Sequence, residues 1–598
     1  MLLILNVLSV YGQENTKTAQ DSAAMYKRIQ SYSEKRRFTK FVHGLIFEPL
    51  TPKKLQKKKQ EDAIRFSAFQ GKIIRKINIT TLDPFGFSER DSTRFPQKPL
   101  SKFGNRMHLK TKQLTIWNLI LLRRKQPLDS LLVKESERLI RAQRFVRRVI
   151  IRPIPTPYKD SVDIDIRELD SWSLVPDAAL SGTKASYELT ERNFLGIGHQ
   201  VYQRYQQDFG EGRSAYSVNY TVPNILNTYI RTDIKYNIDL YGQYRKSIGV
   251  ERPFFSPYAR WGAGAYIDQW FRRDSVPDTQ GLREYQSFKS NASDFWAGHS
   301  IQLFKGDSES ERTTNLITSA RYYNLNYIDR PLPQYDQARF YTDEKNYLIG
   351  LGISSRQFIQ DHYLFNYGII EDVPIGRVFG LVGGLQYKNQ GQQTYAGLKM
   401  SEGRYTNIGY LAYDVEVGSF FRDGISNRSA LVVQADYFTP LLETGKWKFR
   451  QFLKGRMVVG NRRQDSWGDE LTLLGEDGIP GFRSTGFYGT KKWLVTTQTQ
   501  SFSPWDLLGF RLNPFFRYSI GMLGDAEHGF SKSKAYSQIG VGLIISNDYL
   551  VFSSFQLSFA YYPSLPEQAG MYSTNAFSTE DFGLMSFEFA KPEFVDYK

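Results

Sequence analysis

Residues 230–240, IRTDIKYNIDL, alternate between two kinds of side chain. The even-numbered positions are apolar apart from Thr232, and every odd-numbered position carries a charged or amide side chain. Because successive side chains of a β-strand point to opposite faces, this stretch predicts a strand with one apolar face and one strongly polar face. The same partition recurs in residues 216–222, 431–437, 538–543 and 555–561.

The recurrence indicates a transmembrane β-barrel, whose strands turn apolar residues to lipid and polar residues to the lumen. Aromatic residues form 15% of the chain, yet its mean hydropathy of −0.45 is that of a hydrophilic protein. Aromatic girdles at the membrane interfaces account for both values. The only long apolar run, residues 2–10, is too short for a spanning helix of ~20 residues. We therefore predict a mainly β fold, with a transmembrane antiparallel barrel over residues 171–598.

The N-terminal residues suggest export. Residues 1–13 are typical of the end of a secretory signal peptide, although no Lys or Arg precedes the apolar run, and a buried N-terminal strand is the alternative. Residues 14–70 form a basic helical extension and linker that holds part of the net charge of +17. Such a basic segment attracts lipid phosphates, or is simply a solvated helix face. Nucleic acid is not an expected partner, because no base-reading module is visible.

Residues 71–170 have the pattern of a small α/β domain. β-branched runs at 73–79, 149–151 and 162–166 predict three strands. Between the first two, apolar residues at 128, 132, 139 and 140 predict an amphipathic helix that Asp129 or Ser130 can cap. We expect Arg138, Arg141 and Arg144 to be exposed on that helix.

No catalytic constellation is visible. The six histidines are scattered singly, the chain has no cysteine, and no G-x-S-x-G elbow occurs. We therefore expect no enzymatic activity, no metal site and no cofactor.

Three segments resemble the BamA/TamA superfamily. Residues 475–483, GEDGIPGFR, resemble its glycine-rich loop, GG-x-x-x-(V/I/L)-R-G-(F/Y), with Pro480 where the family has arginine. Residues 128–153, LDSLLVKESERLIRAQRFVRRVIIRP, resemble a POTRA domain. Residues 188–201, ELTERNFLGIGHQV, resemble the first barrel hairpin after the last such domain. The resemblance covers the chain from about residue 71 onward and implies about sixteen strands, where the residue pattern alone allows about fourteen to eighteen.

The resemblance also implies a site inside the barrel, because the family's loop folds back into the lumen and its arginine contacts an acidic residue on a late strand. Here Arg517 stands in place of that acid. Either Glu476 or Asp477 pairs with Arg517, or Arg483 takes over the contact, or the contact is lost and these residues are solvated. The expected loop residues are Gly475, Glu476, Asp477, Gly478, Ile479, Pro480, Gly481, Phe482 and Arg483.

A basic stripe should also line the lumen. Charged residues that face lipid at mid-depth cost about 2–4 kcal/mol each, so the basic face of residues 447–457 must point inward. Its members are Lys448, Arg450, Lys454 and Arg456.

The resemblance implies an outer-membrane protein of a Gram-negative bacterium that assembles or translocates polypeptides, with its POTRA-like domain in the periplasm. That domain would receive client segments at its sheet edge, or would only dock the barrel or a partner. The expected partners are outer-membrane lipid, including lipopolysaccharide, unfolded client polypeptides, and periplasmic or lipoprotein subunits. A two-partner-secretion exporter of one substrate and a passive pore or structural barrel are the alternatives.

Overall fold

The computed structural model describes residues 66, 68–278, 280–464, 466–475, 477–482, 487–507, 510–546, 554–564, 571–574 and 582–597. The predicted signal peptide and nearly all of the predicted basic extension lie outside these residues. So do Glu476 and Arg483 of the predicted loop site.

The α/β module is a three-stranded sheet covered by helices. Its strand order is β1-β3-β2, with β1 parallel and β2 antiparallel to β3. Isoleucine and valine side chains from all three strands form a closed core with Val133 and Ile140 of the longest helix. The elements are β1 (Ile73–Leu82), α4 (Pro99–Met107), α5 (Gln113–Trp117), α6 (Ser130–Arg141), β2 (Val146–Pro155) and β3 (Ser161–Asp170).

Helix α6 begins where the sequence predicted. Asp129 is its N-cap, and the carboxylate accepts a hydrogen bond of 3.0 Å from the backbone N–H of Leu131. The predicted exposure of its basic residues was wrong in two of three cases. Arg144 is exposed, but the side chains of Arg138 and Arg141 are only 13% and 7% exposed. The reason is tertiary, because this face of α6 docks onto the barrel.

The remaining strands form one antiparallel sheet that closes into a barrel, in which each strand pairs with its neighbours in the chain and β25 meets β4. Two short extra strands, β18 (Leu442–Thr444) and β21 (Asp506–Leu507), extend single hairpins. The wall strands are β4 (Leu174–Ser181), β5 (Lys184–Phe194), β6 (His199–Asp208), β7 (Arg213–Val222), β8 (Arg231–Ile238), β9 (Tyr244–Arg252), β10 (Trp261–Pro277), β11 (Arg283–Gln302), β12 (Thr314–Asp329), β13 (Glu344–His362), β14 (Ile370–Lys388), β15 (Gly391–Thr406), β16 (Gly409–Arg422), β17 (Ile425–Phe438), β19 (Trp447–Asn461), β20 (Lys491–Phe502), β22 (Phe510–Gly524), β23 (Ala535–Ser546), β24 (Ser554–Ser564) and β25 (Tyr572–Thr574).

The predicted number of about sixteen strands is too low, because twenty wall strands lie within the described residues. The difference arises from short connections. The hairpins β14–β15, β15–β16 and β16–β17 each turn over two residues. In the last of them Asp423 and Gly424 have φ of 51° and 77°, as a type I′ turn requires. The segment that resembles a first hairpin, residues 188–201, forms the second one, because β4 precedes it.

The wall is apolar outside and polar inside, as the alternation predicted. On β13, Tyr347, Ile349 and Leu351 are 46%, 67% and 47% exposed, whereas Asn346 and Ser354 of the opposite face are 4% and 6% exposed. Soluble proteins show the reverse, with polar residues outside. An apolar exterior around a polar interior is the pattern of a barrel whose outer surface faces lipid. Among the described helices, none has the length and apolar character to cross a membrane.

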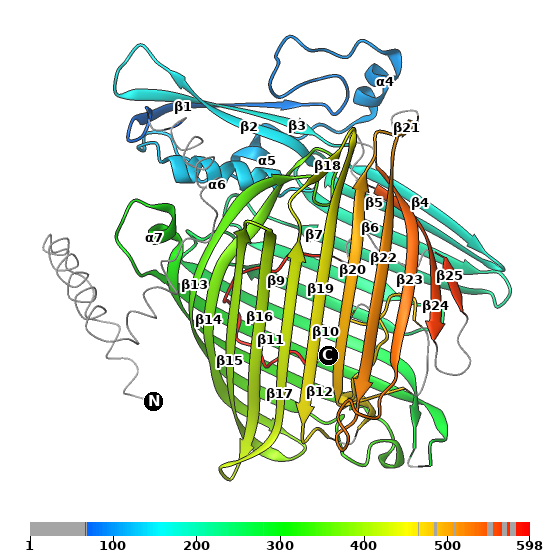
Figure 1. The fold of residues 1–598 in the computed structure, drawn as a ribbon. Coiled ribbons are helices and arrows are strands. Elements are labelled where there is room, and N and C mark those ends of the chain that lie inside the picture. Colours follow the sequence, from blue (N-terminus) through cyan, green and yellow to red (C-terminus); the bar gives the residue numbers. More distant parts are fainter. Residues whose placement is uncertain are drawn as a thin grey trace, which may run out of the picture.

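The module caps one mouth of the barrel (Figure 1). The turn between β5 and β6 reaches it, where the backbone N–H of Lys112 donates to the carbonyl of Gly196 over 2.9 Å. The loop between β7 and β8 reaches it as well, where the side-chain amide of Asn227 donates to the carbonyl of Asn118 over 2.8 Å. The connection between β19 and β20, which holds the predicted loop site, lies at the opposite end of the wall (Figure 1).

Candidate functional site: the barrel lumen and its covered mouth

The described part of the glycine-rich loop folds against the inside of the wall. Ile479 is fully buried and Phe482 is 5% exposed. The ring of Phe482 packs 5.7 Å from that of Tyr536 on β23 and 6.4 Å from that of Tyr562 on β24. The loop is therefore held by the strands that follow it in the chain.

Pro480 anchors the loop through its backbone. Its carbonyl accepts a hydrogen bond of 2.8 Å from the hydroxyl of Tyr562 and a second one from the side-chain amide of Gln538 on β23. The resemblance implies an arginine at position 480. Here the loop is instead anchored at this position by the backbone carbonyl of Pro480, which accepts two hydrogen bonds from neutral side chains. Gly478 allows the tight fold, because a Cβ at this residue would overlap the carbonyl of Leu473.

Asp477 and Arg517 face the same cavity of about 70 Å³, together with Lys454 and Arg456 of the basic stripe. The backbone carbonyl of Asp477 accepts a hydrogen bond of 3.1 Å from the ammonium group of Lys492. With Glu476 and Arg483 outside the described residues, the pairing of the loop with Arg517 stays a prediction.

The four basic residues of β19 occupy one face of that strand and lie among lumen groups. Arg450 is 2% exposed and donates to Asp361 over 2.9 Å and to three backbone carbonyls. Lys448 lies 2.5 Å from Glu443. The outward neighbour Leu453 is 44% exposed. A buried guanidinium with this many acceptors is a structural tie between the β13–β14 turn and β19.

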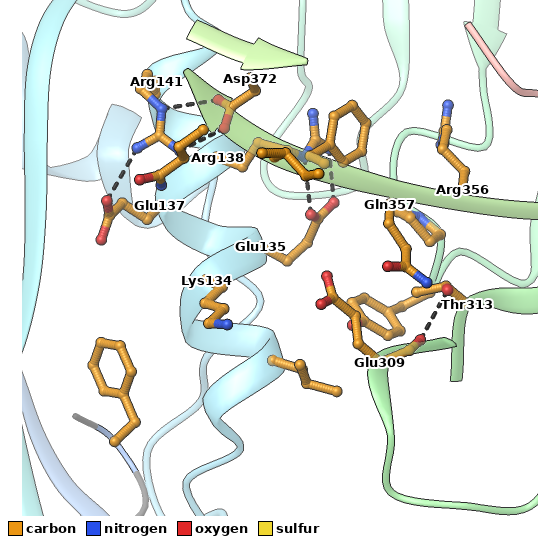
Figure 2. Close-up of a pocket in the computed structure, with 17 residues that line it drawn as sticks. Lys134, Glu135, Glu137, Arg138, Arg141, Glu309, Thr313, Arg356, Gln357 and Asp372 are labelled. Atoms are coloured by element: carbon orange, nitrogen blue, oxygen red, sulfur yellow. Dashed lines mark hydrogen bonds and ion pairs between the residues drawn. The ribbon is translucent and has the colours of Figure 1, made fainter. Parts of the chain in front are cut away.

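The interface between α6 and the wall is a second polar cluster, which the sequence did not reveal. Arg141 forms two hydrogen bonds of 2.8 Å with Asp372 of β14 and one of 3.0 Å with Glu137. Arg138 binds Glu135 in the same bidentate way, at 2.9 and 2.7 Å. These pairs line a cavity of about 140 Å³ between the helix and strands β13 and β14 (Figure 2).

The electrostatics of this interface favour a fixed docking position. Burial raises the pKa of Glu137, and Arg141 opposes that rise. The guanidinium of Arg138 also lies 4.1 Å from the centre of the Phe358 ring on β13. The bidentate pair of Arg141 with Asp372 restricts both distance and angle, so it orients the module as well as attaches it.

The predicted barrel over residues 171–598 extends too far, because the last described wall strand, β25, ends at Thr574 and a further segment lies in the lumen. Residues 582–597 lie inside the barrel and contact strands on several sides of it. The described residues contain no group of three or more side chains suited to hold a metal ion.

No protein family and no curated protein matches the sequence. Three solved structures are similar over most of the chain. BamA from Haemophilus ducreyi lacking POTRA domains 1–3 has 11% identity and a TM-score of 0.36, with 84% of this chain and 83% of that chain covered. CdiB from Acinetobacter baumannii has 8% identity and a TM-score of 0.39, with 92% and 97% covered. CdiB from Escherichia coli has 10% identity and a TM-score of 0.43, with 85% and 75% covered.

The barrel assignment itself rests on the strand order and on the two faces of the wall.

Proposed function

We propose that the protein is an outer-membrane barrel of a Gram-negative bacterium that assembles or translocates other polypeptides. The observation that carries the proposal is the α/β module fixed over one mouth of a closed barrel with a polar interior. A passive pore has no need of such a cover. The resemblance to the BamA/TamA superfamily supports the same class of activity, which requires no covalent chemistry.

The module offers a surface suited to extended polypeptides. Strand β2 pairs with β3 on one side, and no strand of the described residues pairs with its other edge. An edge of this kind accepts an added strand through its backbone groups; toward the end of β2 these are mainly carbonyls, because Pro153 and Pro155 have no N–H. The other edge of the sheet is partly covered, because Ile74 of β1 exchanges hydrogen bonds with the segment around Gln126 and Lys125. We therefore place client binding on β2.

Lipid and polypeptides are the partners that this arrangement fits. The exposed apolar belt of the wall suits lipid chains of the outer membrane, including those of lipopolysaccharide. The module would then face the periplasm, where unfolded polypeptides arrive. Periplasmic or lipoprotein subunits are a further expectation from the resemblance.

Depletion of the protein followed by quantitative proteomics of the outer membrane tests the proposal. Complementation with the wild-type chain is the positive control. Complementation with Asp372→Ala, which removes the main tie between module and wall, should fail, whereas Arg144→Ala should succeed. Loss of several barrel proteins would indicate assembly, and loss of one exported protein would indicate a two-partner-secretion exporter. An unchanged proteome would refute both and leave a passive or structural barrel.

A further inference from the structure

The C-terminal segment crosses the lumen without regular secondary structure (Figure 1). Phe582 packs against β19, with its ring 5.7 Å from that of Phe452. The carbonyl of Phe587 accepts a hydrogen bond of 2.9 Å from the hydroxyl of Ser354 on β13, and Lys591 reaches Asp294 on β11 at 3.4 Å. Tyr597 returns to β19, where its ring covers Gly460. The segment therefore lies along the inner face of the wall from β11 to β19 and occupies part of the lumen.

The wall has a recess shaped for two aromatic rings. Phe587 is fully buried and Phe589 is 5% exposed. A Cβ at Gly352 would lie 2.6 Å from the ring of Phe589, and one at Gly380 would lie closer still. A Cβ at Gly403 would overlap the ring of Phe587 in the same way. Glycines on three adjacent strands, β13, β14 and β15, thus leave room that the two rings fill.

The charges of the segment match those of the wall. All four charged side chains between residues 582 and 597 lie beside a wall residue of opposite sign. The pairs are Glu588 with Arg356 at 2.5 Å, Lys591 with Asp294 at 3.4 Å, Glu593 with Arg321 at 3.3 Å, and Asp596 with Arg456 at 3.0 Å. Arg321 and Asp294 also pair with each other at 2.8 Å, and Lys591 pairs with Glu593 at 3.0 Å, so these four residues form one network.

Backbone groups of the segment are bonded to the wall too. The N–H of Val595 donates to the hydroxyl of Tyr395 on β15 over 2.9 Å, and Arg321 donates to the carbonyl of Pro592 over 3.3 Å. The ring of Phe594 packs 4.6 Å from that of Tyr395. Fixing an extended segment costs backbone entropy at each residue, and this series of contacts offsets that cost.

We infer that the lumen wall carries a binding site for an extended polypeptide with a Phe-x-Phe pair and flanking acidic residues, and that residues 582–597 fill this site as a tethered plug. The inference goes beyond the proposed function, because it concerns the closed state of the pore and requires no client. In an extended segment, residues two apart face the same side, so both rings enter the glycine recess together. Another polypeptide can pass through the lumen only after the plug has left this site.

Single-channel recording in planar lipid bilayers tests the inference. The full chain should show a low unitary conductance, and a chain that ends before Phe582 should show a conductance several-fold higher. A synthetic peptide of residues 582–598 should close the shortened barrel again in a dose-dependent way. The same peptide with Phe587→Ala and Phe589→Ala should need a much higher concentration.

A full-length variant covers the case in which the shortened chain does not fold. Phe587→Ala with Phe589→Ala leaves every strand intact and should raise the conductance and the frequency of opening. Phe516→Ala with Phe559→Ala is the matched control, because these two phenylalanines are 44% and 45% exposed on the outer face. It should behave as the wild type does.

A covalent lock provides the converse test. The chain has no cysteine, so Arg321→Cys with Glu593→Cys can be joined selectively by a short bis-methanethiosulfonate, which forms one disulfide with each thiol and releases sulfinate. The lock should abolish the openings of the Phe587→Ala and Phe589→Ala variant, and reduction should restore them. Equal conductance of full-length, shortened and double-alanine chains, each verified as a folded barrel, would overturn the inference. So would a peptide that closes the pore equally well with and without its two phenylalanines.

Discussion

At the scale of single residues, the position of the module depends on a buried ion pair. Arg141 and Asp372 are 7% and 15% exposed and come from elements 231 positions apart in the chain. Removal of one partner of such a pair leaves the other charge buried without compensation, which costs about 3–5 kcal/mol. Exposed pairs contribute about 0–1 kcal/mol.

We therefore expect Arg141→Ala to loosen the module from the barrel, because Asp372 loses both of its hydrogen bonds to the guanidinium. The rate of limited proteolysis between module and barrel should rise strongly. Arg144→Ala, in the turn that follows α6 and exposed, is the matched control and should change little. A double-mutant cycle with Asp372→Ala should show a coupling of at least about 1 kcal/mol, and strictly additive effects would contradict the contact.

A buried carboxyl group in the module makes its stability depend on pH. Burial, and then the nearby charge of Asp170, hold the pKa of Glu168 well above its usual value. The native state therefore keeps a proton that the unfolded chain releases near its ordinary pKa. The contribution of Glu168 to the stability of the module is therefore complete below the ordinary pKa of a glutamate. It is lost as the pH rises from that value toward the raised pKa of the native state.

Glu168→Gln should remove this loss, so the stability of the module should fall less steeply from about pH 5 upward. The full chain is unfolded in urea at several pH values, and cleavage of the module by a protease reports its unfolding. The measured quantity is the slope of the module's unfolding free energy against pH. Asp163→Asn serves as a contrast. Arg75 lowers the pKa of Asp163, so its contribution is lost as pH falls. A slope that Glu168→Gln leaves unchanged would contradict the assignment.

At the scale of elements, alternate side chains of β19 face the lipid and the lumen. Lys454 lines a cavity inside the barrel, and its neighbour Leu453 is 44% exposed on the outer face. A cysteine in place of Lys454 should react with a water-soluble thiol reagent, and one in place of Leu453 with a lipid-soluble reagent.

The buried Arg450 refines this prediction. Because its side chain is 2% exposed and bound to the turn after β13, a cysteine at this position should react with the water-soluble reagent more slowly than one at Lys454. Labelling of positions 453 and 454 in the reverse pattern would refute the orientation of the strand.

At the scale of the whole molecule, closure of the sheet governs unfolding. Every wall strand has neighbours on both sides, so unfolding has no free edge at which to begin. We expect the full chain to migrate faster on a detergent gel before boiling than after it. Identical mobility in both states would count against a closed barrel. The shortest wall strand is β25, which spans three residues. Substitutions in β25 should therefore lower the temperature of this mobility change more than substitutions in the longer strands.

The alternation of the sequence determined the class of fold and the two faces of the wall. Its period of two equals that of the strand, so Asp233 and Ile234 face opposite sides of the wall, and Asp233 is 8% exposed whereas Ile234 is 47% exposed. Asp129 likewise marked the start of α6, because capping depends on the next few residues of the chain alone.

Only the tertiary structure decided the features that depend on distant partners. The number of strands followed from which turns closed over two residues, and the burial of Arg141 followed from the approach of Asp372. Residues 587–595, FEFAKPEFV, have the composition of another strand, yet they bind across the lumen. The glycine recess comes from the consecutive strands β13, β14 and β15, but the segment that fills it lies almost two hundred residues later in the chain, so local sequence does not predict the contact.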